Sequence, residues 1–550
     1  MHTRPFLRIP LSCLWVAATL TVASLPAKNL GPLTYAGNGR EITITGYEKS
    51  AAGAVVIPET IEGRKMTKIG QEAFMDCREI TSVALPDTIT HIDAKAFAGC
   101  AKLQTINVPD TILMIGAEAF GRCVSLSHIN LGRITQIYDN TFDRCQSLQK
   151  VTIPDEVTSI GNDAFSGCLK LETIAIPDSV NSIGFGAFNR CRKLAAIHVS
   201  ANLLTIGNVA FSNCDSLTGI DVAAGNGTYS SPGGVLFDKS ETTLLQYPGG
   251  RPGDYAIPPG VTKIAQWAFG GCELLTSLSI PASYKENISL VINGQTLGAI
   301  NVDPQNKTFS SVDGVLYNHE QTTLIRYPQG REGSYTVLPS TTTIAESAFS
   351  RCGGLTEVIL PDGLVAIKNM ALYSCESLTH IYLPSYVASI GAGAMGGCDA
   401  LTSITIPEST TTVESSAFAE CPSLAAAYFL GDAPDMGQGV FENSAPGFTI
   451  YFKQGQAGFS TPEWEGYPAQ MLQRDDPVFN KARALANASG GGKTRTWTDH
   501  TGQHRIEAEF VGLAGTTVTL LKLDGETAKV PIDRLSAADQ ALARKLAQER

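Results

Sequence analysis

The sequence predicts an α/β-type solenoid: a stack of short coils with a parallel sheet, β-hairpin inserts and a small β-domain at its C-terminal end. Three observations support this prediction. Cysteines recur at a period of about 23 residues, within the range typical of repeat proteins. A large apolar residue stands three positions before each cysteine, and an alternating segment that usually ends in proline follows. A fixed period of this length means that each repeat buries its apolar face against its neighbours, as in a solenoid.

The cysteine period is the most regular feature of the chain. It covers Cys77, Cys100, Cys123, Cys145, Cys168, Cys191, Cys214, Cys272, Cys352, Cys375, Cys398 and Cys421. The residues three positions earlier are Phe74, Phe97, Phe120, Phe142, Phe165, Phe188, Phe211, Phe269, Phe349, Leu372, Met395 and Phe418. Because both side chains keep one offset, we expect them to fill the core, with Phe97, Cys100, Phe165 and Cys168 as representative positions.

A single coil can be followed from residue 92 to residue 109. Apolar residues alternate over 103–108, which predicts a short strand with one buried face. Pro109 then ends the hydrogen-bonded ladder, since proline has no N–H. Residues 95–100 are too few for a full α-helix and predict one helical turn. Glycine often follows the central isoleucine, but Asp93 stands there in this coil, so a required positive φ is not predicted at that position.

The N-terminal segment 1–27 predicts a signal peptide. Arg4 and Arg8 precede an apolar run over 9–23, and the small residue Ala27 closes a cleavage site. The run is short for a membrane span, and no other stretch is long enough, so no transmembrane segment is predicted. We therefore expect a protein that is secreted, periplasmic or held at the cell surface.

The remaining chain divides into five segments. These are an N-terminal cap (28–58, with a hairpin turn at 37–39), the solenoid (59–421), a C-terminal cap (422–472), a linker (473–492) and a final module (493–550). Within the solenoid, two inserts near 224–256 and 302–338 share one sequence pattern, a duplication longer than a single coil. Their alternating residues around Gly and Asp predict β-hairpins that project from the stack.

The final module has the pattern of a small barrel. Strands are predicted over 505–513, 516–523 and 527–532, with a tight turn at 524–525. Ser536 and Asp539 then form a capping pair for a short helix.

Composition argues against several kinds of chemistry. The net charge of −11 excludes nucleic acid as the main partner, because phosphate binding needs clustered Lys and Arg. No Cys-x-x-Cys pair or matching histidine predicts a metal site, and neither a catalytic set nor a cofactor motif is found. The repeat cysteines are predicted to be free thiols packed in the core, with some disulfides as the alternative in an oxidising compartment.

The outward face of the later repeat strands is a candidate binding face. Positions five and seven residues after each repeat cysteine point away from the core. Early coils carry small polar residues there, whereas later coils carry Glu357, Ile359, His380, Tyr382 and Tyr428. This composition is typical of a recognition patch, although single exposed apolar residues are also ordinary on protein surfaces.

The recurring string Ile-Gly-x-x-Ala-Phe-x-x-Cys-x-x-Leu-x-x-Ile-x-Ile-Pro, seen over 160–177, resembles the BspA-like leucine-rich repeat family. The Asp-Gly-Val-Leu-Tyr string at 313–317 resembles the same family. The resemblance covers about residues 30–472 and implies a leucine-rich repeat stack. Members include bacterial surface and secreted proteins, some of them adhesins.

Residues 495–539 resemble the first Sla-type homology domain, which is SH3-like and binds short peptides. The matching strings are Arg495-Thr-Trp497-Thr-Asp499, Ile506-Glu507-Ala508-Glu509-Phe510, Val518-x-Leu520-x-Lys522, Val530-Pro531 and Leu535-Ser536-x-x-Asp539. The resemblance implies a peptide-binding module, with Trp497 and Lys522 as its candidate residues.

Together these features predict an exported, non-enzymatic scaffold that binds a protein or glycan ligand at more than one surface. A structural spacer in an extracellular matrix or envelope is the alternative. A carbohydrate-active enzyme is a third hypothesis, which needs two carboxylates about 5–9.5 Å apart across one groove. Neither the ligand's identity nor the oligomeric state follows from the sequence.

Overall fold

The computed structural model describes residues 28–37, 41–286, 296–473, 476, 494–501, 504–522 and 527–548. The expected signal peptide, the centre of the hairpin turn at 37–39, nearly all of the linker and the turn at 524–525 lie outside the described residues.

Every regular coil contributes one strand to each of two faces, and the strands of each face pair in parallel. The solenoid prediction is therefore confirmed. We call the strands that precede the repeat proline the proline face. They are β4 (Gly53–Val56), β7 (Ile80–Ala84), β9 (Thr105–Asn107), β11 (His128–Ile129), β13 (Lys150–Thr152), β15 (Thr173–Ala175), β17 (Ala196–Val199), β19 (Gly219–Val222), β23 (Gly253–Ala256), β25 (Leu275–Ile280), β26 (Ala299–Val302), β30 (Gly333–Thr336), β32 (Leu355–Ile359), β34 (His380–Ile381), β36 (Ser403–Ile406), β38 (Ala426–Phe429), β40 (Thr449–Lys453) and β42 (Tyr467–Leu472).

The second face, which the sequence did not predict, is formed by the central isoleucines and is called the isoleucine face. Its strands are β3 (Glu41–Tyr47), β6 (Arg64–Ile69), β8 (His91–Ile92), β10 (Met114–Ile115), β12 (Gln136–Ile137), β14 (Ser159–Ile160), β16 (Ser182–Ile183), β18 (Thr205–Ile206), β24 (Lys263–Ile264), β31 (Thr343–Ile344), β33 (Ala366–Ile367), β35 (Ser389–Ile390), β37 (Thr412–Val413) and β39 (Asp435–Met436). Parallel register on both faces mostly follows the sequence period: Lys150 pairs with Thr173, and Ile160 with Ile183.

The two faces are joined by tight turns and not by the helical turn predicted at 95–100. The N–H groups of Ala96 and Ala98 donate to carbonyls three residues earlier, in the same coil. Those of Lys95, Phe97 and Gly99 instead donate to carbonyls of the next coil. A helix would use i−4 carbonyls within its own turn. Every second N–H therefore extends the ladder between coils through the bend, and the helical prediction is wrong.

Backbone conformation in these turns requires two left-handed residues per coil. The first column includes Lys95, Glu118, Asn140 and Val209, each with φ between 55° and 57°. The second column includes Arg190 and Gly99, at φ 61° and 75°. The glycine after the central isoleucine does not have a positive φ. At Gly184 a Cβ would come within 2.5 Å of the Asn162 backbone nitrogen, so this glycine permits close approach of adjacent coils.

Val209 is the residue least suited to this column, because a β-branched side chain strains a left-handed backbone. We expect Val209→Asn, which places the residue type of Asn140 in the column, to stabilise the protein by about 0.5–1 kcal/mol. Urea unfolding followed by circular dichroism measures the change. The matched control is Val56→Asn, at an extended strand position that is 74% exposed. A Val209→Asn variant no more stable than the Val56→Asn variant would contradict the strain argument.

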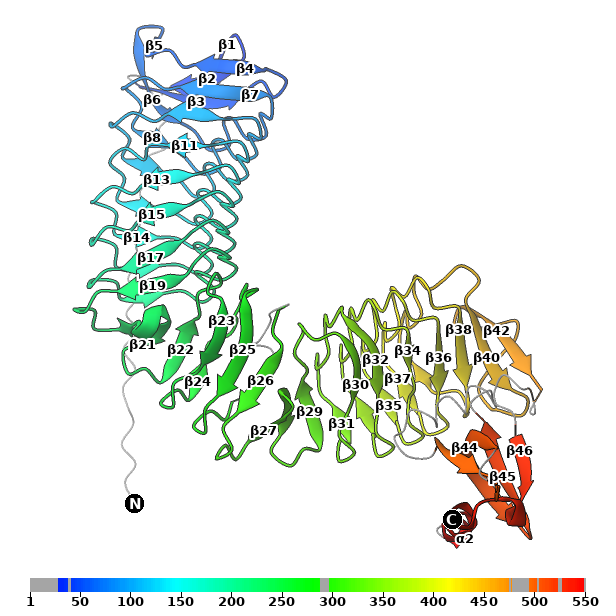
Figure 1. The fold of residues 1–550 in the computed structure, drawn as a ribbon. Coiled ribbons are helices and arrows are strands. Elements are labelled where there is room, and N and C mark those ends of the chain that lie inside the picture. The colour runs from blue at the N-terminus through cyan, green and yellow to red at the C-terminus, as the bar shows by residue number, and fades with distance from the viewer. Residues whose placement is uncertain are drawn as a thin grey trace, which may run out of the picture.

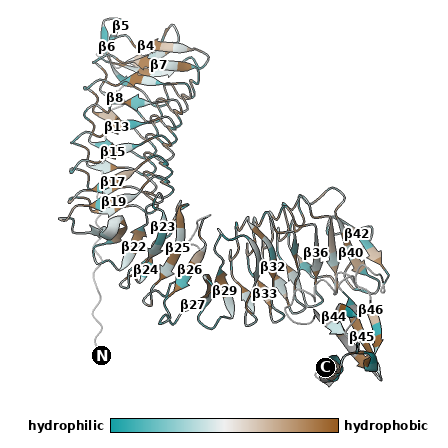
Figure 2. Ribbon diagram, in the orientation of Figure 1, coloured by the Kyte–Doolittle hydropathy of each residue, from teal (hydrophilic) through white to brown (hydrophobic). Residues whose placement is uncertain are grey.

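Stacked phenylalanines and cysteines fill the interior. Phe97 and Phe120 are fully buried, with ring centroids 5.4 Å apart and planes 2° apart, and Phe165 continues the row. Cys100 and Cys168 are fully buried beside this row. Figure 2 shows apolar residues on strands throughout the solenoid.

The two inserts do not project from the stack, in contrast to the prediction. The first contains β20 (Tyr229–Ser230), η1 (Pro232–Gly234), β21 (Leu236–Asp238) and β22 (Thr243–Gln246), and the second contains β27 (Phe309–Val312), β28 (Val315–Asn318) and β29 (Thr323–Arg326). On β21, Leu236 belongs to the first apolar core and Phe237 to the second. On β28, Leu316 belongs to the second core and Tyr317 to the third. Each insert therefore lies between two cores and buries side chains on both of its faces.

A buried asparagine holds the first insert to the preceding coil. The Nδ2 of Asn226 donates to the carbonyls of Ser200 and Leu203, at 2.7 and 3.0 Å. Its Oδ1 accepts the N–H groups of Thr228 and Tyr229, each at 2.8 Å. Asn306 occupies the same place in the second insert. The stack changes direction in the region of the inserts (Figure 1). We call the coils before the first insert, up to β19, the first arm, and the coils after the second insert, from β30 to β42, the second arm.

Both ends of the solenoid are covered by antiparallel strands. At the start, β1 (Lys28–Leu30) pairs with β2 (Leu33–Gly37), and β2 pairs with β3. β5 (Thr60–Ile61) pairs with β6. At the other end β41 (Glu463–Trp464) pairs with β42. Within the segment expected as the C-terminal cap, Phe441 follows Phe418 by one repeat period and stacks on it at 5.5 Å, so a further coil precedes the cap strands. Antiparallel covering protects strand edges from pairing with other chains.

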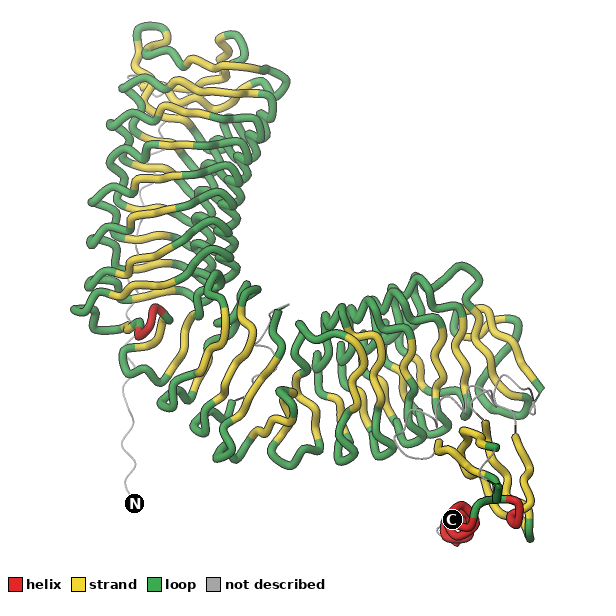
Figure 3. Tube along the Cα trace, viewed as in Figure 1, coloured by secondary structure: helices red, strands yellow, loops and turns green. Residues whose placement is uncertain are grey.

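The C-terminal module is an antiparallel sheet with a short helix. Its strands are β43 (Thr494–Thr498), β44 (Arg505–Ala514), β45 (Thr517–Lys522) and β46 (Thr527–Pro531), followed by η2 (Ile532–Arg534) and α2 (Ala537–Gln548). Ser536 and Asp539 form the expected cap, since the Asp539 N–H donates to the Ser536 hydroxyl at 3.2 Å. Among the described residues, α2 is the one α-helix (Figure 3).

Candidate binding surfaces

The proline face of the second arm holds the five residues of the candidate binding face. Glu357 and His380 are register partners on β32 and β34. Ile359 and Tyr382 occupy the next outward position of the same two coils, and Tyr428 occupies it on β38. Tyr382 and Tyr428 are two coils apart, or about 10 Å, with the shorter Thr405 between them.

A sixth residue, Tyr451, extends this set. It pairs in register with Tyr428, and the two rings stack at 5.2 Å between centroids with planes 18° apart. Tyr451 lies one repeat period after Tyr428, so the period could have identified it, although no cysteine marks its coil. We call Ile359, Tyr382, Thr405, Tyr428 and Tyr451 the tyrosine column.

Two phenols of the tyrosine column, those of Tyr382 and Tyr428, stay protonated at neutral pH. Partial burial, followed by the nearby Glu357 carboxylate, raises the pKa of Tyr382. Burial and the neighbouring Tyr451 likewise raise the pKa of Tyr428. His380 is exposed, and its ring lies 6.4 Å from that of Tyr382. The column thus offers half-buried aromatic rings with hydroxyl groups that can donate hydrogen bonds.

The twelve repeat cysteines are buried free thiols. Cys100 donates to the carbonyl of Phe74 in the preceding coil at 3.0 Å, and Cys191 donates to that of Phe165 at 3.2 Å. Burial raises the pKa of Cys214 and of Cys352 to about 12. Since the thiolate is the reactive form, these thiols are chemically inert in the folded chain.

We therefore expect native protein beginning at residue 28 to show almost no reaction with a thiol reagent at pH 8. In unfolded protein, all twelve thiols should react with the reagent. A substantially smaller number after unfolding would instead indicate disulfides. The raised pKa values also stabilise the fold fully below about pH 9, and this contribution is lost as pH rises toward 12, because only the unfolded thiols ionise. The urea concentration at the unfolding midpoint should therefore decrease as the pH is raised from 8 to 10.5.

The C-terminal module uses Trp497 differently from the expectation. The indole is 1% exposed, and its Nε1–H donates to the Ala508 carbonyl at 2.9 Å. Trp497 is therefore a core residue and offers no surface to a peptide, because its ring is covered. Lys522 is half-buried at the end of β45.

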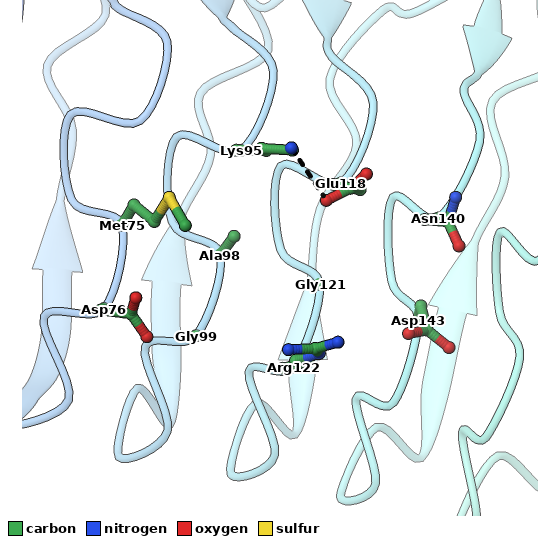
Figure 4. Close-up of a pocket in the computed structure, with 10 residues that line it drawn as sticks. All are labelled: Met75, Asp76, Lys95, Ala98, Gly99, Glu118, Gly121, Arg122, Asn140 and Asp143. Atoms are coloured by element: carbon green, nitrogen blue, oxygen red, sulfur yellow. Dashed lines mark ion pairs between the residues drawn. The ribbon is translucent and has the colours of Figure 1, made fainter.

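Pockets lie in the turns between the faces in both arms. The first is in the first arm, where Lys95 and Glu118 form an ion pair at 3.6 Å beside Arg122 and Asp143 (Figure 4). Burial raises the pKa of Asp143, against the effect of Arg144. In the described part of the chain, no group of three or more His, Cys, Asp or Glu side chains is placed to hold a metal ion. None of the described helices has the length and apolarity to cross a membrane.

Comparison with known proteins identifies both parts of the chain. The family model "BspA type Leucine rich repeat region (6 copies)" matches residues 67–133, 132–231, 254–329 and 333–446. The model "SLA1 homology domain 1, SHD1" matches residues 487–550. No curated protein matches the chain.

Several solved structures are similar to this chain. A leucine rich cell surface protein from Faecalibacterium prausnitzii is 27% identical with a TM-score of 0.48, covering 74% of this chain and 96% of its own. The pneumococcal vaccine antigen PcpA is 20% identical with a TM-score of 0.35, covering 78% and 94%. A leucine-rich repeat protein from Bacteroides ovatus is 20% identical with a TM-score of 0.33, covering 81% and 99%. The repeat model matches more than half of the residues of this chain, so the chain belongs to the BspA-type leucine-rich repeat family.

Proposed function

We propose that this protein is an exported binding scaffold that holds an extracellular protein or glycan on the proline face of its second arm. The tyrosine column is the observation that carries this proposal. Tyrosine contributes large contact area at low entropic cost and is enriched among the residues that dominate binding energy. Three half-buried tyrosines occupy one outward position within four successive coils, with Thr405 in the coil between Tyr382 and Tyr428.

A structural spacer would need no such set of tyrosines. In the first arm the matching outward positions carry small or polar residues, such as Asn107, Thr152 and Ala175. Both arms have the same fold and the same core, so folding alone does not account for the difference between their outer faces. This contrast favours a binding role for the second arm over the spacer hypothesis.

The C-terminal module would supply a second contact. Its match to SLA1 homology domain 1 supports a peptide-binding role. Trp497 would support that role from the core of the module. Two tethered binding units raise the effective concentration of the second once the first has bound.

The double variant Tyr382→Ala/Tyr428→Ala tests the proposal. Full-length protein is assayed against a panel of extracellular-matrix proteins and glycans, and each ligand bound by the wild type is titrated. We expect affinity to fall by about thirtyfold or more, since each truncation removes over about 1 kcal/mol. Tyr138→Ala is the matched control, because Tyr138 is 39% exposed on the first arm. If both variants bind as the wild type does, with unchanged melting temperatures, the tyrosine column is not the binding site.

A further inference from the structure

A second pocket lies in the turns at the start of the second arm, away from the tyrosine column. Its volume is about 510 Å³, within the range of ligand sites. It is lined by Gln329, Gly330, Arg331, Glu332, Arg351, Gly353, Gly354, Ser374 and Glu376. The three glycines leave their backbone uncovered on the pocket wall.

Two arginines in this pocket have no ion-pair partner among the described residues. Arg331 lies over the Tyr327 ring, with its guanidinium carbon 5.8 Å from the ring centroid. Arg351 is exposed, at φ 61° in the second left-handed column. Arg326, 3% exposed, is a further buried cation nearby: burial, together with the charge of Arg351, lowers its pKa. Arg331 and Arg351 therefore bring to the pocket two guanidinium groups that form no ion pair in the described part of the chain.

Hydrogen-bond acceptors line the same pocket. Glu332 and Glu376 are exposed, and neither forms an ion pair in the described part of the chain. Ser374 adds a hydroxyl. A complementary ligand carries one carboxylate for the guanidinium groups and several hydroxyls for the carboxylates. The catalytic carboxylic acid of a glycosidase is held in an apolar environment, whereas Glu332 and Glu376 are both exposed. The pocket is therefore better suited to binding a sugar than to hydrolysing a glycosidic bond.

The first insert provides an internal comparison, because its sequence pattern matches that of the second. There Arg251, the counterpart of Arg331, donates to the carbonyl of Gly233. The other matched pairs are Gln246 for Arg326, Gly249 for Gln329, Pro252 for Glu332, Gly271 for Arg351, Glu273 for Gly353 and Leu274 for Gly354. Among these pairs the second copy is more positive by two charges, one of which is on Arg326, a residue that does not line the pocket, and Glu376 adds a negative charge on the next coil. It also has glycines where the first has the large side chains of Glu273 and Leu274.

We propose that this pocket binds a carboxylate-bearing sugar, such as a uronic or sialic acid residue of a glycan. Arg331 and Arg351 hold the carboxylate, an arrangement in which a guanidinium donates two parallel hydrogen bonds. Glu332, Glu376 and Ser374 accept hydrogen bonds from ring hydroxyls. The glycines at 353 and 354 provide the space that the first insert fills. This site is separate from the tyrosine column and does not depend on it.

The test is isothermal titration calorimetry of the full chain with glucuronic acid, N-acetylneuraminic acid, glucose and acetate. We expect at least one acidic sugar to bind more tightly than both glucose and acetate. Arg351→Gly should weaken that binding by about tenfold or more, because a charge-assisted contact is lost. The variant should fold normally, since glycine suits a positive φ. Arg190→Gly is the matched control, with the same charge and φ in the first arm.

Gly354→Leu is an independent variant that restores the residue of the first insert. A Cβ there would lie 2.7 Å from the Glu332 Cγ and 3.3 Å from the Arg331 carbonyl oxygen, so the Glu332 side chain must shift as the leucine fills the pocket. An unchanged melting temperature shows that the fold persists. Loss of acidic-sugar binding in this variant supports the proposal. The proposal is overturned if neither acidic sugar binds, if glucose or acetate binds equally well, or if Arg351→Gly binds as tightly as Arg190→Gly.

Discussion

Replacing Asn306 by alanine is expected to lower the free energy of unfolding by about 3–5 kcal/mol. The side chain is 1% exposed and makes four hydrogen bonds: to the carbonyls of Pro281 and Tyr284 at 2.8 and 2.9 Å, and from the N–H groups of Thr308 and Phe309 at 2.9 Å. Alanine leaves all four backbone groups buried without this partner. The second insert packs between the second and third apolar cores. A less firmly held insert should therefore destabilise both of these cores together.

The measurement is the urea midpoint, followed by circular dichroism. Asn306→Asp should also be strongly destabilising, because the carboxylate accepts the two N–H bonds but faces two carbonyls that need donors. Asn208→Ala, at an exposed position, is the control and should change stability by about 0.5 kcal/mol at most. An Asn306→Ala midpoint equal to that of the control would show that the asparagine does not hold the insert in place.

Trp497→Ala is expected to unfold the C-terminal module while the solenoid stays folded. Removing a buried tryptophan costs about 3–5 kcal/mol, which is comparable to the whole stability of a domain this small. The substitution also removes the Nε1–H bond to Ala508 and the ring contact with Phe510 at 6.0 Å. Limited proteolysis of the full chain should then cleave after residue 493 and leave the solenoid intact.

Trp497→Phe separates the packing of the ring from its hydrogen bond to Ala508. Phenylalanine keeps an aromatic ring against Phe510 and loses the hydrogen bond, so the module should stay folded with reduced stability. If Trp497→Ala instead leaves the module resistant to protease, the tryptophan is not the core residue that the structure indicates.

Much of the solenoid could be predicted because its period is a local and repeated signal. Phe97 and Cys100 recur at fixed offsets, and any side chain that does so in every coil must pack in the same place. The turns are harder to predict, because a segment of this length can form either a helical turn or a turn with two left-handed residues. Lys95 and Val209 are not residues that indicate a positive φ, and the ladder between coils imposes it on them.

The inserts show a different limit of the sequence. Alternation on β21 predicts a strand with two distinct faces, but does not say whether the second face meets water or another core. The buried Asn226 and Asn306 could have indicated the difference only once their four partners were known.

The candidate site could be predicted only in part. The offset from the repeat cysteines locates Tyr382 and Tyr428, but it does not locate Tyr451, whose coil has no cysteine. The motif indicates that Trp497 belongs to the module, but a motif gives the residue type and not the direction of the side chain, which is buried. The pocket around Arg331 and Arg351 depends on which coils adjoin an insert, which no local pattern encodes.

Hydrogen exchange of the full chain, with and without a ligand retained in the binding panel, tests the central claim most directly. The proposed function predicts slower exchange on ligand binding over β32, β34, β36, β38 and β40, with the first arm unchanged. Protection confined to the first arm, or to the C-terminal module alone, would contradict a binding face built on the tyrosine column.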